Sequence, residues 1–216
     1  GTGSTGAASA LAYLACLRHP ERMASGTRRV LGSQNVSRMC LVCGEANPFG
    51  LRGRFLLVGA DKDEDASAIA DGGDPPRGDG AASPSFEVLG LFQVREEHQG
   101  YPGRLHGGVS AAILDETIGR AILATEPGTW GVTVEFTARY RAPVPLDAEV
   151  RALGRIVRDS RRFFEGTGEI LLPDGTVAVE GRGRYVKLAI ADIAPGFEEQ
   201  GEWLADERPL PDSVRV

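Results

Sequence analysis

The alternation of apolar and polar positions along the chain predicts a β-rich domain that contains one long helix. Apolar runs at 51–58 and 86–95 are typical of strands. Over 107–123 the apolar residues recur at spacings of three and four around nearly the whole circumference of a helix, so this helix should be buried. The pattern after it predicts four further strands, at 131–141, 149–158, 162–172 and 176–188.

The order of these elements indicates the fold class. Two strands, one buried helix and then a run of neighbouring strands match an α+β protein, in which an antiparallel sheet wraps around one long central helix. A parallel βαβ arrangement would need several crossover helices, and the middle of the chain predicts only one. The sequence Leu-Pro-Asp-Gly-Thr at 172–176 is a turn signal that joins the last two strands as a hairpin.

The predicted domain spans residues 40–190, and three segments differ from it in composition. Residues 1–39 hold five arginines and one acid, a pattern of organellar targeting sequences, and a disordered or helical extension is the alternative. Residues 61–85 contain one large apolar residue among Asp, Gly, Ala, Ser and Pro, so we expect a disordered insertion loop between two strands. Residues 191–216 form an irregular C-terminal tail whose Phe197 and Trp203 pack back on the surface.

Composition excludes some classes of protein. With 42% hydrophobic and 25% charged residues, the 216-residue chain can build a sizeable core. A net charge of −6 argues against nucleic acid as the main partner, and no apolar run reaches the roughly 20 residues that a membrane span needs. Three cysteines argue for a reducing compartment. We therefore expect a cytoplasmic protein, with a mitochondrial or other organellar location as the alternative that the Arg-rich N-terminus offers.

The stretch 104–119 carries the candidate chemistry. His106, Gly107 and Gly108 stand where a loop becomes the predicted helix, and glycines at a helix start leave backbone N–H groups free to face a ligand oxygen. Asp115 and Glu116 interrupt the apolar run, and a buried carboxylate is costly unless it is paired or used. Together they offer a donor that polarises a carbonyl and a base or nucleophile that attacks it, which indicates an acyl-transfer site.

Several of these polar residues have a purely structural alternative. Glu116 could pair with Arg120 four residues later, and Asp115 could share in such a pair. We expect His106 to order the loop by a hydrogen bond rather than act as a base, and His98 to be a surface residue. Arginines on the later strands could meet phosphate groups or simply solvate a sheet edge: Arg139, Arg141, Arg158, Arg161 and Arg162.

Cys40 and Cys43 form a single Cys-x-x-Cys pair. No second pair and no nearby histidine accompany it, so a zinc site would need ligands from elsewhere in the fold. We expect a thiol pair that is buried or stabilises its loop, and no bound metal.

These motifs in this order resemble the hotdog-fold acyl-CoA thioesterases, in the PaaI-like branch whose His-Gly-Gly motif precedes a helix that bears an acid. Here the motif is 106–108, and Asp115 follows its histidine by nine positions. The segments 40–51 and 97–103 resemble the start of the domain and the loop before the motif, and 133–144 resembles the strand after the helix. The likeness covers roughly residues 40–188.

The resemblance implies a hotdog fold and hydrolysis of an acyl-CoA or acyl-carrier thioester to a free acid and a thiol. In that reading the backbone N–H of Gly107 polarises the thioester carbonyl, beside His106, and Asp115 is the base or the nucleophile. No cofactor is implied, because coenzyme A is part of the substrate. The substrate-binding residues that we expect are Gly108, Gln99, Glu116 and Arg141.

Helix geometry makes the site depend on assembly. Nine residues of helix rise about 13 Å, so His106 and Asp115 of one chain cannot both contact one carbonyl. The resemblance implies a homodimer or a dimer of dimers, in which the loop of one subunit meets the helix of the other. Some relatives place an Asn six residues before the motif histidine to orient water; that position is Gly100 here, and either Gln99 substitutes or another arrangement binds the water.

Two other functions remain open from the sequence. A hotdog hydratase or dehydratase would use an Asp and His pair at a different spacing, which the chain does not contain. A non-catalytic acyl-CoA-binding or scaffold protein of the same fold is favoured by the glycine at position 100.

Overall fold

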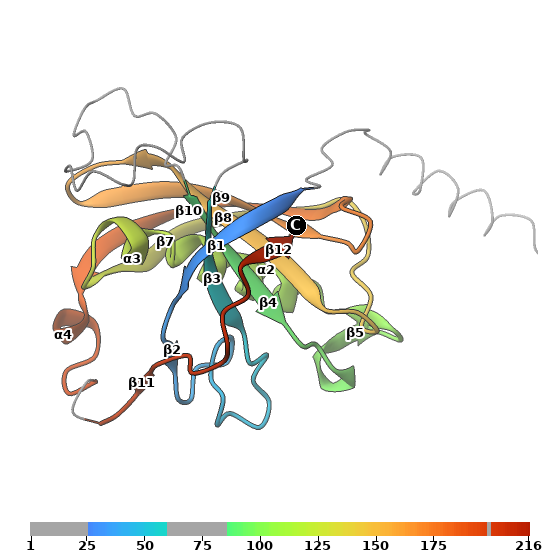
Figure 1. Cartoon of the computed structure of the whole chain (residues 1–216), viewed down its shortest axis with the longest axis horizontal. Coiled ribbons are helices and arrows are strands. Elements are labelled where there is room, and N and C mark those ends of the chain that lie inside the picture. The colour runs from blue at the N-terminus through green and yellow to red at the C-terminus, as the bar shows by residue number, and fades with distance from the viewer. Residues whose placement is uncertain (1–25, 60–85, 198–199) are drawn as a thin grey trace, which may run out of the picture.

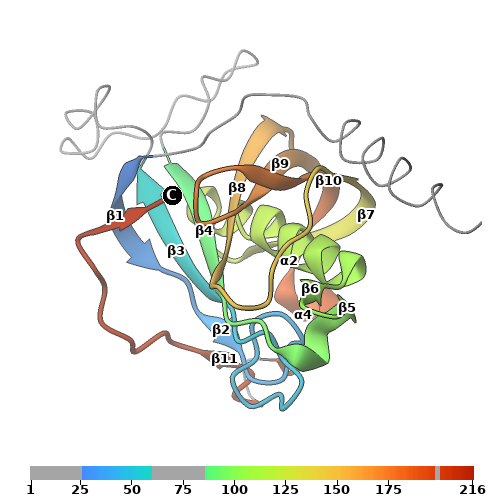
Figure 2. The same ribbon diagram turned by 90° about the vertical axis from the view of Figure 1, so that its right-hand side faces the viewer.

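The computed structural model describes residues 26–59, 86–197 and 200–216, and its main feature is an antiparallel sheet curved around helix α2 (Figures 1 and 2). Helix α2, Gly107–Gly119, packs against β4, β7, β8, β9 and β10. In spatial order the eight strands are β12 (Ser213–Arg215), β1 (Thr27–Ser33), β3 (Arg54–Gly59), β4 (Phe86–Phe92), β8 (Val150–Asp159), β9 (Phe163–Leu171), β10 (Val177–Ala189) and β7 (Thr129–Tyr140). The predicted α+β arrangement, an antiparallel sheet wrapped around one central helix, is confirmed and is the hotdog fold.

Short elements fill the ends of this framework. A 3-10 turn, η1 (Glu96–His98), leads into the hairpin of β5 (Gln99–Tyr101) and β6 (Arg104–Leu105), which precedes α2. The other short elements are β2 (Val36–Ser37), α3 (Ile122–Thr125), α4 (Ile190–Ile193) and β11 (Trp203–Leu204), with β11 paired to β2. None of the helices in the described part of the chain is long and apolar enough to cross a membrane.

The core lies between α2 and the concave face of the sheet. Ile113, Leu114 and Ile118 of α2 are fully buried there, and burial of each such side chain is worth about 1.5–3 kcal/mol. Glycines on the facing strands let the helix approach closely. A Cβ at Gly154 would lie 2.7 Å from the carbonyl oxygen of Thr117, so only glycine fits this contact. The position of α2 therefore depends on glycine at this point of the sheet, because any side chain here would push the helix away.

The helix is shorter than the predicted 107–123. After Gly119 the backbone tightens to 3-10 geometry. The N–H groups of Ala121 and Leu123 donate to carbonyl groups three positions back instead of four. Arg120 turns inward at this point and is buried. The apolar periodicity continues into α3, so the sequence pattern does not mark the break.

The sheet begins earlier in the chain than the predicted boundary at residue 40. Strand β1 lies within the predicted extension 1–39, where it pairs with β3 through Val30 and Val58 and with β12 through Arg28 and Val214. Exposed and half-buried positions alternate along β1, as expected for a strand with one face toward solvent. The sequence did not predict this strand because its two adjacent arginines interrupt the alternation of apolar and polar residues. The first 25 residues and the predicted insertion at 61–85 lie outside the described residues.

The predicted irregular tail at 191–216 also contributes to the fold. It forms α4 and the strands β11 and β12. The expected packing of its aromatic residues is confirmed: Trp203 and Phe197 lie against Trp130 with ring centroids 4.6 and 5.7 Å from it. The tail returns along the outside of the sheet and adds the edge strand beside β1 (Figure 1).

Candidate active site

Asp115 lies in the middle of α2 on the side that faces β7 and β10. Its Oδ1 accepts a hydrogen bond of 2.9 Å from the Thr133 hydroxyl and one of 3.2 Å from the Tyr185 hydroxyl. Tyr185 also reaches the backbone carbonyl of Asp115. Both donors meet one carboxylate oxygen, and among the described residues none donates to Oδ2. The carboxylate is thus fixed in orientation with one oxygen left for chemistry.

A bulge in β7 gives Thr133 its direction. Along β10, Arg184 pairs with Glu135 and the next residue, Tyr185, pairs with Thr133, so Val134 is an extra residue in β7. An extra residue reverses the alternation of side chains along a strand. Thr133 therefore shares the helix-facing side of the sheet with Tyr185, and Val134 is left 54% exposed. Bulges often aim a side chain at a functional site in this way.

The surroundings of Asp115 change its acidity. Burial raises the pKa of its carboxyl above the usual range, and the adjacent Glu116 carboxylate adds to this rise. The hydroxyl groups of Thr133 and Tyr185 oppose it by bonding to the ionised form. Burial and the nearby carboxylates raise the pKa of Tyr185 as well, so Tyr185 remains a protonated donor. A half-buried carboxyl with a raised pKa is the kind of group that enzymes use as a base.

The start of α2 presents a backbone donor. His106 is the N-cap, and its Nδ1 accepts the N–H of Gly108 at 2.9 Å. The hydrogen bond that we expected His106 to make at the helix start is therefore present. Gly107 occupies the first helical position, where the N–H has no partner within the helix, and the carbonyl of Gly107 accepts a 2.8 Å bond from the Tyr140 hydroxyl. No residue in the described part of the chain accepts the N–H of Gly107, which leaves this group available to a ligand oxygen.

The prediction for His98 was wrong, since this residue is buried and not on the surface. Its Nδ1 accepts the N–H of Arg95, so its Nε2 must carry the proton, which it donates to the carbonyl of Phe49 at 3.0 Å. The carbonyl of His98 in turn accepts the N–H of His106. His98 thereby supports the loop that carries the His-Gly-Gly motif, and a buried histidine with both nitrogens bonded is a structural residue.

The other predicted substrate-binding residues lie at the Gly107 end of the helix or face away from Asp115. Gln99 lines an open depression of about 600 Å³ together with Arg104 and Leu146. At Gly100, where relatives place an Asn, a Cβ would lie 3.1 Å from the Cα of His106. The Arg141 guanidinium binds Glu180 at 2.7 Å, so this arginine already has a charge partner.

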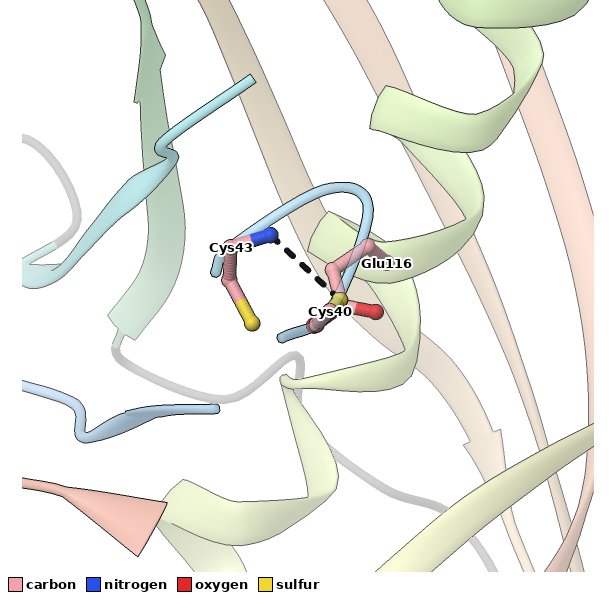
Figure 3. Close-up of side chains that lie close together, drawn as sticks. All are labelled: Cys40, Cys43 and Glu116. Carbon is pink, nitrogen blue, oxygen red and sulfur yellow. Dashed lines mark hydrogen bonds between the residues drawn. The ribbon is translucent and has the colours of Figure 1, made fainter. Parts of the chain in front are cut away.

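Glu116 is directed toward the loop that contains Cys40 and Cys43 (Figure 3). Its carboxylate pairs with the Arg120 guanidinium at 2.8 Å, the i,i+4 alternative considered for this residue. The hydrogen bond from the Cys43 thiol, together with backbone N–H groups, lowers the pKa of Cys40 to about 6, and burial opposes this. The same hydrogen bond and burial raise the pKa of Cys43. Glu116 is thus held in a separate cluster on the other side of the helix.

The two groups predicted to act on the carbonyl, the Gly107 N–H and the Asp115 carboxylate, lie too far apart in one chain to reach the same carbonyl. Gly107 and Asp115 are eight residues apart on one helix, a rise of about 12 Å. Their partners on β7, Tyr140 and Thr133, are separated by seven positions on that strand. A site that uses both groups would therefore take one half-site, Gly107 with Tyr140, from one chain and the other half-site, Asp115 with Thr133, from a second chain.

Sequence reasoning missed three hydroxyl groups of this region, those of Thr133, Tyr140 and Tyr185. Each belongs to a strand predicted from its apolar alternation, and a tyrosine in a strand is ordinarily a packing residue. The bulge that turns Thr133 toward Asp115 leaves no mark in the sequence. Only the pairing of β7 with β10 shows it.

Comparison with known proteins gives consistent matches. Residues 102–179 match the family model of the thioesterase superfamily. The chain is similar to human acyl-coenzyme A thioesterase 13, with 29% identity over 101 residues that cover 47% of this chain and 71% of that protein. The mouse protein of the same name is 30% identical over 70 residues, 32% of this chain and 50% of its own. Among solved structures, zebra fish thioesterase superfamily member 2 is 24% identical with a TM-score of 0.44, over 46% of this chain and 73% of that chain.

Proposed function

Because residues 102–179 of this chain match the family model of the thioesterase superfamily, we propose that it hydrolyses the thioester of an acyl-CoA or acyl-carrier substrate, at a site shared between two copies of the chain. The observation that carries the proposal is the environment of Asp115: a half-buried carboxylate with a raised pKa, fixed through Oδ1 by two hydroxyl groups. A carboxylate so held is ready to act through Oδ2.

The reaction needs few groups. The thioester carbonyl oxygen accepts the Gly107 N–H, supported by the positive end of the helix dipole, and a donor of this kind is worth about 3 kcal/mol in the transition state. Asp115 then takes a proton from water as the water oxygen attacks the carbonyl carbon. The C–S bond breaks, and the thiolate leaves and takes up the proton. Direct attack by Asp115, with an anhydride that water later opens, is the alternative route.

A second copy of the chain can complete the site through β7. This strand ends the sheet order, so its outer edge has no partner within the described chain. A long unpaired edge is a ready surface for pairing with another copy. Antiparallel pairing of two β7 strands centred on Thr137 places Phe136 of one copy opposite Ala138 of the other. With the bulge at Val134 counted, it also places Thr133 of one copy opposite Tyr140 of the other. Since Thr133 holds Asp115 and Tyr140 holds Gly107, this register joins the two half-sites.

The compartment and the substrate range belong to the same proposal. Cys40 and Cys43 are both free thiols, which fits a reducing compartment. The human and mouse relatives are named for acyl-coenzyme A, and we propose the same class of thiol carrier for this chain. A panel of short, long and aromatic acyl-CoA esters would define the preferred acyl group.

Replacement of Asp115 tests the proposal. Asp115→Asn keeps the shape of the side chain but removes the base, so kcat on acyl-CoA esters should fall by about 10²- to 10⁴-fold while binding of the ester persists. Turnover measured by thiol release and binding measured by calorimetry separate the two effects. Asp192→Asn, on the exposed surface of α4, is the matched control. Unchanged turnover in Asp115→Asn would refute the mechanism, and a wild type inactive on every ester would favour a non-catalytic binding protein.

A further inference from the structure

We propose that Cys40, Cys43 and Glu116 form a binding site for a thiophilic divalent cation, with Zn²⁺ as the best fit, that joins the 40–44 loop to helix α2. The two sulfur atoms and a carboxylate oxygen lie within 4.8 Å of one another (Figure 3). They come from two segments that are more than 70 positions apart in the sequence. The sequence pair alone lacked a further ligand, and the fold supplies one from α2.

The tight turn of residues 40–44 brings the sulfur atoms of Cys40 and Cys43 close together. The Cys40 Sγ accepts the backbone N–H groups of Val42 at 3.3 Å and Cys43 at 3.4 Å. The turn is closed by the Gly44 N–H, which donates to the Cys40 carbonyl at 2.8 Å. A Cβ at Gly44 would lie 2.7 Å from the Cys40 nitrogen, so a larger residue would open the turn. Backbone donors on a sulfur stabilise the thiolate form, which is the form that binds metal.

Arg120 balances the charge of the proposed site. Its side chain is only 5% exposed, and its Nε lies 2.8 Å from Glu116 Oε1. It is held by the Asn35 carbonyl, also at 2.8 Å, and by the Phe55 ring, whose centroid is 4.0 Å from the guanidinium carbon. Two thiolates and one carboxylate carry three negative charges, which Zn²⁺ and Arg120 neutralise. Buried charges are tolerated when they are paired in this way.

The ligand set and its spacing fit zinc. Tetrahedral zinc binds sulfur at about 2.3 Å and carboxylate oxygen at about 2.0 Å, which places the ligand atoms roughly 3.5–3.8 Å apart. From separations of at most 4.8 Å, a closure of about 1 Å completes this geometry. Thiolate ligands select zinc over harder cations such as Mg²⁺. Three protein ligands leave the fourth position to water.

Cobalt titration of the full chain tests this proposal without reference to activity. The protein is reduced, stripped of metal with a chelator and titrated with Co²⁺, whose thiolate complexes absorb in the near ultraviolet. We expect this band to saturate at one Co²⁺ per chain and to vanish when Zn²⁺ displaces it. Cys40→Ser and Cys43→Ser should lose the band, and Glu116→Gln should weaken binding at least tenfold. Cys16→Ser and the exposed Glu149→Gln are the matched controls.

Measurements on the wild type keep the test decisive if a cysteine variant fails to fold. Addition of Zn²⁺ should raise the melting temperature of the wild type, and thiol counting should show that Cys40 and Cys43 are protected once Zn²⁺ is bound. A reduced wild type with both thiols free that gives no cobalt band would overturn the proposal. The proposal would also be overturned if the isolated protein contains a Cys40–Cys43 disulfide and binds no metal after this disulfide is reduced. Thioesterase activity can fail independently, since none of these readouts depends on it.

Discussion

At the scale of single residues, the chemistry of Asp115 depends on two hydroxyl groups that belong to neighbouring strands. Thr133 and Tyr185 both donate to Oδ1, and they stabilise the carboxylate against the cost of its burial. Because the pKa of Asp115 is still raised, the folded state favours the protonated form, and ionisation of Asp115 costs stability as the pH rises through its pKa. The proposed reaction therefore requires the ionised form of Asp115, whereas the stability of the fold is greater with the protonated form.

The pH profile of the reaction should report this balance. A base must be ionised, so kcat/KM should rise with pH through the pKa of Asp115, above the range of an ordinary carboxyl. Thr133→Val removes one donor to the ionised form and should move this acid limb to higher pH. Thr167→Val, on β9 and without a bond to Asp115, should leave the limb in place. A limb that does not move in Thr133→Val would remove Asp115 as the titrating base.

The sequence identified candidate site residues where a residue type is unusual at its position in a predicted element. Asp115 stands out because a carboxylate in an apolar helix is costly, and His106 because it precedes a helix start. His98 was misjudged because its two bonding partners, Arg95 and Phe49, come from the local turn and from a distant loop. These partners come together only in the folded chain, so the local sequence around His98 does not predict its burial.

At the scale of elements, the contact between α2 and the sheet fixes the positions of the proposed catalytic groups. Gly154 faces the backbone of the helix at Thr117, and other glycines on β9 and β10 face the helix or its neighbours: Gly166, Gly168, Gly181 and Gly183. The predicted strands and helix are present because their apolar periods are strong. The bulge at Val134, the helix end at Gly119 and the strand β1 escaped prediction, because each is decided by pairing or packing with distant residues.

A methyl group at this contact should therefore be costly. Gly154→Ala places a Cβ 2.7 Å from a backbone oxygen that cannot rotate away, so the free energy of unfolding should fall by about 1–3 kcal/mol. Urea denaturation measures the change. Gly32→Ala on β1 is the matched control, since nothing lies within 4 Å of its added Cβ. Equal stabilities for the two variants would contradict the role of Gly154 in helix approach.

At the scale of the whole molecule, the proposed enzyme is complete only as a pair of chains. The two half-sites of one chain lie about 12 Å apart along α2, and β7 offers its open edge to a second copy. A shared site makes a specific prediction for mixed dimers. Two inactive variants, each with a lesion in a different half-site, should restore activity when they are mixed.

Gly107→Pro and Asp115→Asn form such a pair. Proline removes the Gly107 N–H, and it suits the first helical position, since His106 already has the extended conformation that a following proline requires. After subunit exchange, half of the dimers are mixed and each holds one intact site, so about a quarter of the wild-type rate should return. Neither variant alone should show this activity. A mixture that stays inactive, or a protein that sediments only as a monomer under assay conditions, would contradict the shared site.

The pairing of β12 with β1 has a consequence for how the chain folds. Residues 27–29 pair with residues 213–215, which lie more than 180 positions further along the sequence. Contacts of such long range form slowly, because a long loop must close before they contribute any stability. During synthesis, β1 leaves the ribosome long before the strand that covers its outer edge exists. We therefore expect the newly made chain to pass through a stage in which β1 is exposed to pairing with other molecules. Its two adjacent arginines, Arg28 and Arg29, discourage such contacts and protect the strand until β12 is made.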